Sequence, residues 1–168
     1  MIYKTEALSS QHNRKQFDCG VASLTRYFQQ QASQDQKRKV AACFVFCESE
    51  KILGYYTLSS ASVGLDKLPA NLQKKLPRYP FVPTTLMGRL AIDRTARGRR
   101  LGETLLFDAM FRALDASQAV ASFALLVDAL DIEPDPLPFY EQYGFQRLDS
   151  DSRTLYIPMK TIGKLPRF

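Results

Sequence analysis

The 168-residue sequence predicts an α/β fold in which a mixed sheet is flanked by helices. Two observations carry this prediction. First, the strand-like run Leu86–Asp93 is followed by apolar residues at helical spacing over Glu103–Ala116 and by a second strand-like run, Val120–Asp128. A strand–helix–strand unit of this length pairs its two strands in parallel. Second, Val40–Cys47 and Ile52–Ser59 are strand-like runs joined by a short polar turn, which predicts an antiparallel hairpin.

Before the hairpin, the sequence predicts a strand, a helix and a loop. Ile2–Leu8 is the strand, and a helix is expected to begin near Gly20, with Asp18 as its cap. The polar stretch Gln29–Lys39 predicts a loop.

After the hairpin, Ser60–Thr84 is a long, proline-rich connection with a short helix expected within Leu65–Leu76. The elements expected near the C-terminus are a helix at Phe139–Tyr143, antiparallel strands at Phe145–Asp149 and Thr154–Met159, and a frayed basic tail, Gly163–Phe168.

Length and composition place limits on the function. The chain suits one domain over residues 1–168, with a normal apolar core. It has no apolar run of membrane-spanning length and no signal-peptide pattern, so a cytoplasmic protein is expected. Its net charge of +6 favours an anionic partner such as CoA or nucleic acid. His12 is the only histidine and the three cysteines form no paired framework, so no metal site is expected.

The segment Asp93–Gly102 carries four arginines and two glycines between the predicted central strand and helix. A basic glycine loop that leads into a helix presents backbone N–H groups and the positive end of the helix dipole to an anion. The segment therefore predicts a phosphate-binding loop, although a solvated, arginine-rich helix start has the same composition.

This loop resembles the acetyl-CoA signature Q/R-x-x-G-x-G/A of the GNAT N-acetyltransferases, with Arg97 first and Gly102 last. Arg100 occupies the middle glycine position, which departs from the pattern. An ordinary helical backbone is expected there, with the Arg100 side chain pointing outward. The resemblance implies the GNAT fold, in which two central parallel strands splay apart around acetyl-CoA. The residues that it implies for binding acetyl-CoA are Leu90, Ala91, Ile92, Arg97, Gly98, Arg99, Arg100, Leu101, Gly102 and Phe139.

A second landmark, Pro138–Phe145, matches the F-Y-x-x-x-G-F signature that follows in the same family. By this match Tyr140 is the expected general acid that protonates the departing CoA thiolate. A positioned acid contributes about 10²–10⁴-fold to a rate. Packing beside acetyl-CoA is the alternative role for Tyr140. No general base is expected, because a free α-amine with a pKa near 8 is partly neutral at cytosolic pH.

Most of the chain resembles the GNAT toxins of bacterial type II toxin–antitoxin pairs. The similarity includes F-D-C-G at Phe17–Gly20, Gly54–Ser60, L-P-R-Y-P at Leu76–Pro80, and Gly88–Asp93. It implies an enzyme that acetylates the α-amine of an aminoacyl-tRNA and so stops translation. It also implies a ribbon-helix-helix antitoxin as partner, and a homodimer is a further expectation.

A tRNA substrate requires a basic surface that follows the phosphates. The favoured candidates are Arg78, Lys74 and Lys75, and the weaker candidates are Lys37–Lys39, Lys164 and Arg167. Two other functions stay open at this point. One is a GNAT enzyme that acetylates a protein or a small amine, and the other is a non-catalytic binding module that has lost its activity through Arg100.

Overall fold

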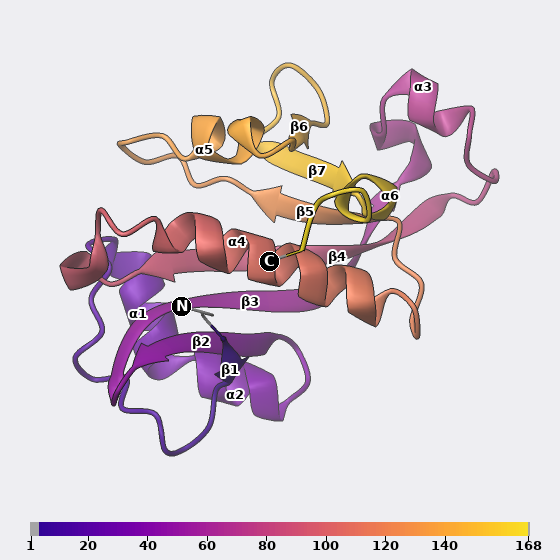
Figure 1. The fold of residues 1–168 in the computed structure, drawn as a ribbon. Helices are drawn as coiled ribbons and strands as arrows, with labels where there is room; N and C mark the ends of the chain where they lie inside the picture. The colour runs from indigo at the N-terminus through magenta and orange to yellow at the C-terminus, as the bar shows by residue number, and fades with distance from the viewer. Residues whose placement is uncertain (1–3, 168) are drawn as a thin grey trace. The chain divides into compact units, whose positions relative to one another are not determined.

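A computed structural model describes residues 4–167 of the chain. The elements of the N-terminal half are β1 (Glu6–Ala7), α1 (Ala22–Gln30), α2 (Ala32–Lys37), β2 (Ala42–Glu48), β3 (Lys51–Gly64), η1 (Leu65–Lys67) and α3 (Ala70–Gln73). The C-terminal half holds β4 (Phe81–Ile92), η2 (Arg94–Ala96), α4 (Leu101–Ala116), β5 (Ala124–Asp128), α5 (Leu137–Gln142), β6 (Gln146–Arg147), β7 (Thr154–Pro158) and α6 (Met159–Ile162). Figure 1 shows these elements along the chain.

The strands form a mixed seven-stranded sheet in the order β1-β2-β3-β4-β5-β7-β6, with one parallel pair. The pairs β1–β2, β2–β3, β5–β7 and β6–β7 are antiparallel. The predicted mixed sheet is therefore confirmed, and so is the hairpin of β2 and β3. No helix within residues 4–167 is long and apolar enough to cross a membrane.

The chain forms two compact units. The first holds the described residues up to Ser59 together with Met87–Met110, and the second holds Ser60–Leu86 together with the described residues from Phe111 onward. Strands β3 and β4 and helix α4 each contribute to both units. Each unit has an apolar core of its own, and one domain over residues 1–168 stays a prediction.

The core of the first unit is built on three aromatic rings. Phe28 stacks on Tyr55 with ring centroids 4.4 Å apart, and Phe17 meets both rings edge-on. Cys43 and Val45 of β2 are buried in the same cluster, and Cys47 packs against it. Aromatic pairs in these geometries stabilise a core beyond the area they bury.

Gly54 allows β3, β4 and α4 to approach one another closely in the first unit. A Cβ atom at this position would lie 2.6 Å from Leu105 Cδ1, 2.9 Å from Ile92 Cδ1 and 3.1 Å from the Ala91 carbonyl oxygen. The two shortest distances are to side-chain ends and the third is to a backbone oxygen, so a larger residue would require these packed groups to shift. This steric requirement explains a glycine in the middle of a buried strand.

In the second unit, β5 and β7 pair along their whole length, and Leu126 and Tyr156 lie opposite each other. These two residues belong to a buried cluster against which Leu72, Leu86 and Phe123 pack. Leu72 lies on α3, so the long connection between β3 and β4 is anchored to this core.

Several predicted elements differ from the structure: β3 continues to Gly64 and β4 begins at Phe81, both inside the predicted connection Ser60–Thr84. The predicted loop Gln29–Lys39 contains α2, which the prediction missed because polar contacts hold it rather than an apolar stripe. The Gln36 side chain donates to the Leu8 carbonyl (2.6 Å) and accepts from the Cys43 N–H (3.0 Å). The predicted strand Ile2–Leu8 begins outside the described residues and is limited within them to Glu6–Ala7.

The predicted frayed tail is anchored at least as far as Arg167. Its guanidinium binds the Asp115 carboxylate (2.5 and 3.2 Å) and lies 4.8 Å from the centre of the Phe111 ring. The prediction was wrong because a basic tail with few apolar residues gives no signal for an ion pair with a distant helix.

Candidate functional site

The connection from β4 to α4 carries most of the predicted acetyl-CoA residues, and all of it lies in the first unit. Leu90, Ala91 and Ile92 end β4, and η2 leads into the loop that continues as α4 at Leu101 (Figure 1). The N–H groups in the first turn of α4 have no acceptor within the helix. They are therefore available to an anion.

Asp93, at the end of β4, is the buried carboxylate that organises this connection; only 3% of the residue is exposed. Its Oδ1 accepts a hydrogen bond from the Asp18 N–H (2.9 Å), and its Oδ2 accepts from the N–H (3.1 Å) and the hydroxyl (2.5 Å) of Thr95. Lys51 Nζ lies 3.9 Å from the same Oδ2. Burial alone would raise the pKa of Asp93, but the hydrogen bonds and the Lys51 charge outweigh it, and the pKa is lowered.

The F-D-C-G turn, Phe17–Gly20, binds the loop at further points. The Arg94 N–H donates to the Asp18 carbonyl (2.9 Å), and the Arg94 guanidinium lies 3.2 Å from the Asp18 carboxylate. The Arg97 guanidinium donates to the Cys19 carbonyl (3.0 Å). Two segments more than 70 residues apart in sequence are thus joined by backbone and side-chain contacts.

The contact between the F-D-C-G turn and the loop requires glycine at position 20. Its φ of +84° is favourable mainly for glycine, and a Cβ atom would lie 2.5 Å from Arg97 Nη2. The neighbouring Asp18 was predicted to cap α1, and this prediction was wrong. Helix α1 begins at Ala22 without a side-chain cap, and Asp18 Oδ1 instead accepts from the Gly20 N–H (2.8 Å) within the turn.

The arginine side chains of the loop have partners within the protein. Arg97 binds the Cys19 carbonyl, Arg99 lies 2.6 Å from Glu48 Oε2, and Arg100 lies 2.8 Å from Glu103 Oε2. The sequence predicts that these side chains add charge around a phosphate. In this arrangement the arginine side chains hold the loop in shape.

The backbone at Arg100 differs from the prediction. An ordinary helical conformation was expected, but φ is +58°, in the left-handed region. The family's glycine therefore serves a conformational need that arginine meets at a cost of about 1–2 kcal/mol. The predicted outward direction of the side chain is correct, since 80% of it is exposed. Sequence reasoning missed the strain because it assumed that the helix already included Arg100.

Tyr140 and Phe139 lie on α5 in the second unit. Tyr140 is buried and meets the rings of Phe139 and Phe145 edge-on, at centroid distances of 5.2 and 5.7 Å. Burial raises the pKa of Tyr140 to about 12. Its hydroxyl has no hydrogen-bond partner among residues 4–167, so no acceptor in this part of the chain binds the phenol proton.

The predicted substrate cations Lys74, Lys75 and Arg78 are exposed and follow α3 in the second unit. Within the described chain, none of the three pairs with an acidic side chain. Arg167 is different, because its guanidinium is taken by Asp115. Lys37 ends α2 and Lys164 follows α6, both on other parts of the chain.

A hollow of about 420 Å³, lined mostly by polar residue types, lies beside the F-D-C-G turn in the first unit. The residues that line it are Asp18, Gly20, Ala22, Thr25, Arg26, Gln29, Gln30 and Arg94. No site was predicted here from the sequence. The turn and Arg94 belong to segments with a recognisable motif, but the other lining residues come from α1 and carry none.

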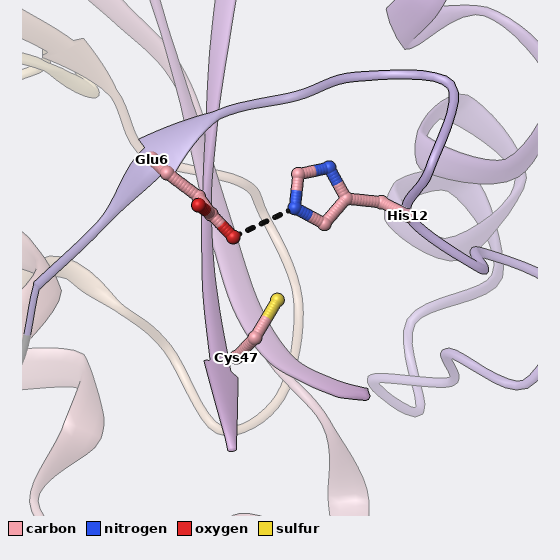
Figure 2. A group of neighbouring side chains, drawn as sticks. All are labelled: Glu6, His12 and Cys47. Atoms are coloured by element: carbon pink, nitrogen blue, oxygen red, sulfur yellow. Dashed lines mark hydrogen bonds and ion pairs between the residues drawn. The ribbon is translucent and has the colours of Figure 1, made fainter. Parts of the chain in front are cut away.

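The structure also brings Glu6, His12 and Cys47 together, with possible ligand atoms within 4.8 Å of one another (Figure 2). The Ser9 N–H donates to His12 Nδ1 (2.9 Å), so a neutral ring carries its proton on Nε2, which faces Glu6 Oε1 at 2.9 Å. Burial, followed by the Glu6 charge, raises the pKa of Cys47. A metal needs a free nitrogen lone pair and a thiolate. Hydrogen bonding therefore accounts for this group better than a metal does.

Comparison with known proteins places the chain in a family. No protein-family model matches it. A "tRNA-acetylating toxin" of Mycobacterium tuberculosis (strain ATCC 25618 / H37Rv) is 34% identical over 144 residues, which cover 86% of this chain and 84% of the relative. The chain belongs to the tRNA-acetylating toxins, GNAT-type acetyltransferases of toxin–antitoxin systems.

Solved structures of such toxins have the same fold. A tyrosine-to-phenylalanine mutant of KacT superposes with a TM-score of 0.88 at 30% identity, over 96% of this chain and 98% of that one. AtaT complexed with acetyl-methionyl-tRNAfMet superposes with a TM-score of 0.86, also at 30% identity and with the same coverage. The predicted GNAT fold is therefore confirmed for this toxin.

Arg100→Gly and Arg100→Ala together test the strain in the loop. Both changes remove the exposed pair with Glu103, and only glycine relieves the positive φ. We expect the glycine variant to be more stable than the alanine variant by about 1 kcal/mol, measured as the free energy of unfolding in urea. Equal stability of the two variants would show that the left-handed backbone at this position carries no strain.

Proposed function

We propose that this toxin transfers the acetyl group of acetyl-CoA to the α-amine of an aminoacyl-tRNA and thereby blocks translation. The observation that carries the proposal is its membership of the tRNA-acetylating toxins. Related structures support each component of the reaction. AtaT has been solved with acetyl-methionyl-tRNAfMet, with acetyl-CoA, and with the C-terminus of its antitoxin AtaR.

In the proposed reaction, the neutral α-amine attacks the thioester carbonyl. The C–N bond of the amide forms, the C–S bond breaks, the nitrogen loses a proton, and the CoA thiolate gains one. The α-amine has a pKa near 8, so a useful fraction is neutral at cytosolic pH without a strong general base. The residues of the chain then have two main tasks, which are to hold the thioester and to supply a proton.

The proposed binding surface for acetyl-CoA is the end of β4 with the loop that follows. Backbone groups of Leu90, Ala91 and Ile92 would bind the acetyl and pantetheine portion and stabilise the oxyanion. The N–H groups of Arg97–Gly102, at the positive end of the α4 dipole, would bind the pyrophosphate. Phe139 is proposed to line the pantetheine arm. The Asp93 hydrogen bonds and the F-D-C-G turn support this role because they fix the loop before any ligand arrives.

Tyr140 is the proposed general acid. Its raised pKa keeps the phenol protonated at neutral pH, and its hydroxyl has no partner in the described chain that would hold the proton. A buried phenol beside apolar rings is therefore ready to donate to a thiolate. Lys74, Lys75 and Arg78 are the proposed contacts for tRNA phosphates, since they are exposed and unpaired within residues 4–167.

An antitoxin is the expected protein partner. The related toxins form complexes with their antitoxins on DNA, as in the KacTA–DNA complex and the AtaT–AtaR complex bound to DNA. These DNA complexes support the finer proposal that the partner here is a ribbon-helix-helix protein. A homodimer and a cytoplasmic location are also proposed.

Tyr140→Phe tests the assigned chemistry. Removing the phenol proton should lower kcat for acetyl transfer about 10²–10⁴-fold and leave acetyl-CoA affinity unchanged. The measurement follows label from acetyl-CoA into a pool of charged tRNAs. Tyr143→Phe, at the C-terminal cap of the same helix, is the matched control and should keep full activity. Label that appears only in proteins or small amines would contradict the tRNA substrate, and absence of acetyl-CoA binding by the wild type would indicate a non-catalytic module.

The pH dependence tests the state of Tyr140 in the wild type. A general acid acts in its protonated form, which is present below its pKa and lost as pH rises through it. With this pKa raised to about 12, kcat/KM should rise as the substrate amine deprotonates near pH 8 and then stay level. Initial rates between about pH 6.5 and about pH 9.5 give the profile. A falling limb with a midpoint near pH 9 would show that Tyr140 is not the acid, or is not buried.

A further inference from the structure

Tyr79 and Phe81 are the only large aromatic side chains that are strongly exposed in the described chain; Tyr79 is 69% and Phe81 is 65% exposed. The other exposed large apolar residues are aliphatic and lie elsewhere, at Val40, Val120 and Leu130. Exposed rings raise the free energy of the isolated protein unless a partner covers them. Their occurrence two residues apart points to a shared partner.

The rings follow a group of unpaired cations. Lys74, Lys75 and Arg78 come directly before them, and no acidic side chain within residues 4–167 pairs with any of the three. The whole connection Ser60–Thr84 contains four basic residues and one acidic residue, Asp66. A partner that suits this segment is therefore anionic and also offers flat, apolar faces.

Hydrogen bonds within the segment and packing of Leu72 against the core of the second unit hold the segment in place, so it presents the rings on a formed surface. The Leu65 N–H donates to the Pro80 carbonyl (3.0 Å), between the two aromatic residues. Gln73 Nε2 donates to the Leu68 carbonyl (2.7 Å), and Leu72 packs into the cluster around Leu126 and Tyr156. Binding would therefore require little ordering of the protein backbone, which favours affinity.

We propose that Tyr79 and Phe81 stack on unpaired nucleotides at the 3′ end of the tRNA, with Lys74, Lys75 and Arg78 on the adjoining phosphates. Only Pro80, at which the chain bends, separates the two residues, so both rings are close enough to contact successive bases. Base–aromatic stacking combined with cations along the backbone is how proteins bind single-stranded nucleic acid. An RNA duplex hides its base faces and would use only the cations.

The identification of the partner as tRNA rests on the proposed function. The test of the stacking surface measures RNA binding and does not depend on catalysis. The double variant Tyr79→Ala/Phe81→Ala is compared with Tyr79→Phe/Phe81→Tyr, which keeps both rings, and with Val120→Ala, which removes exposed apolar surface elsewhere in the same unit. All three altered positions are on the surface, so circular dichroism should be unaltered. The probe is a fluorescent unpaired RNA with the sequence of the tRNA 3′ end.

We expect the double alanine variant to bind this RNA at least about tenfold more weakly, because each stacked base contributes about 1–3 kcal/mol. The ring-preserving pair and Val120→Ala should bind like the wild type. In acetyl transfer the double alanine variant should raise KM for charged tRNA with kcat and acetyl-CoA affinity unchanged. Binding of the unpaired RNA within twofold of the wild type would overturn the proposal. The proposal would also be overturned if the double alanine variant lost self-association or antitoxin binding while its RNA binding was unchanged.

The two proposals fail in different ways. If the wild type transfers no acetyl group to any charged tRNA, the proposed function fails. In that case a ring-dependent affinity for unpaired RNA would still support the stacking surface. If the wild type acetylates tRNA and the double alanine variant has the same KM, the stacking surface is wrong and the proposed function stands.

Discussion

The buried carboxylate of Asp93 is the constraint on which the proposed acetyl-CoA surface depends. Taking a carboxylate out of water is unfavourable unless hydrogen bonds replace its hydration. Here the donors come from two segments, the Asp18 N–H and Thr95, with Lys51 nearby. Meeting this requirement fixes the F-D-C-G turn against the start of the loop. Contacts within the protein therefore set the shape of the loop.

The contact between the F-D-C-G turn and the loop explains why several residues of the toxin-like motifs are needed. Gly20 leaves room for the Arg97 guanidinium, and Gly54 leaves room for Leu105 and Ile92. Both glycines permit close approach to the β4–loop–α4 segment within the first unit. Their neighbours Phe17 and Tyr55 form the aromatic core beneath it. Two of the segments that make the sequence recognisable as a toxin, Phe17–Gly20 and Gly54–Ser60, thus support the proposed binding loop.

Apolar periodicity and turn residues were enough to predict β2, β3, β4, α4 and α5, because packing decides those elements. Features decided by a distant polar contact could not be predicted. Helix α2 depends on Gln36, which binds backbone groups of two other segments, and the tail depends on the ion pair of Arg167. The positive φ at Arg100 was missed because only the family's glycine hinted at it, and here that glycine is absent. Residue roles at the site remain predictions from the motif.

The most direct test of this account is the affinity of acetyl-CoA for Asp93→Asn, measured by calorimetry beside Lys51→Ala. Asparagine keeps the size of the side chain but turns an NH₂ group toward donors that need an acceptor, which costs about 1–3 kcal/mol. A loss of about 1.4 kcal/mol corresponds to a tenfold change in affinity. We therefore predict that Asp93→Asn binds acetyl-CoA at least about tenfold more weakly than the wild type, and that Lys51→Ala changes this affinity by less than about twofold. A folded Asp93→Asn protein that binds acetyl-CoA as tightly as the wild type would contradict the claim that this carboxylate holds the binding loop.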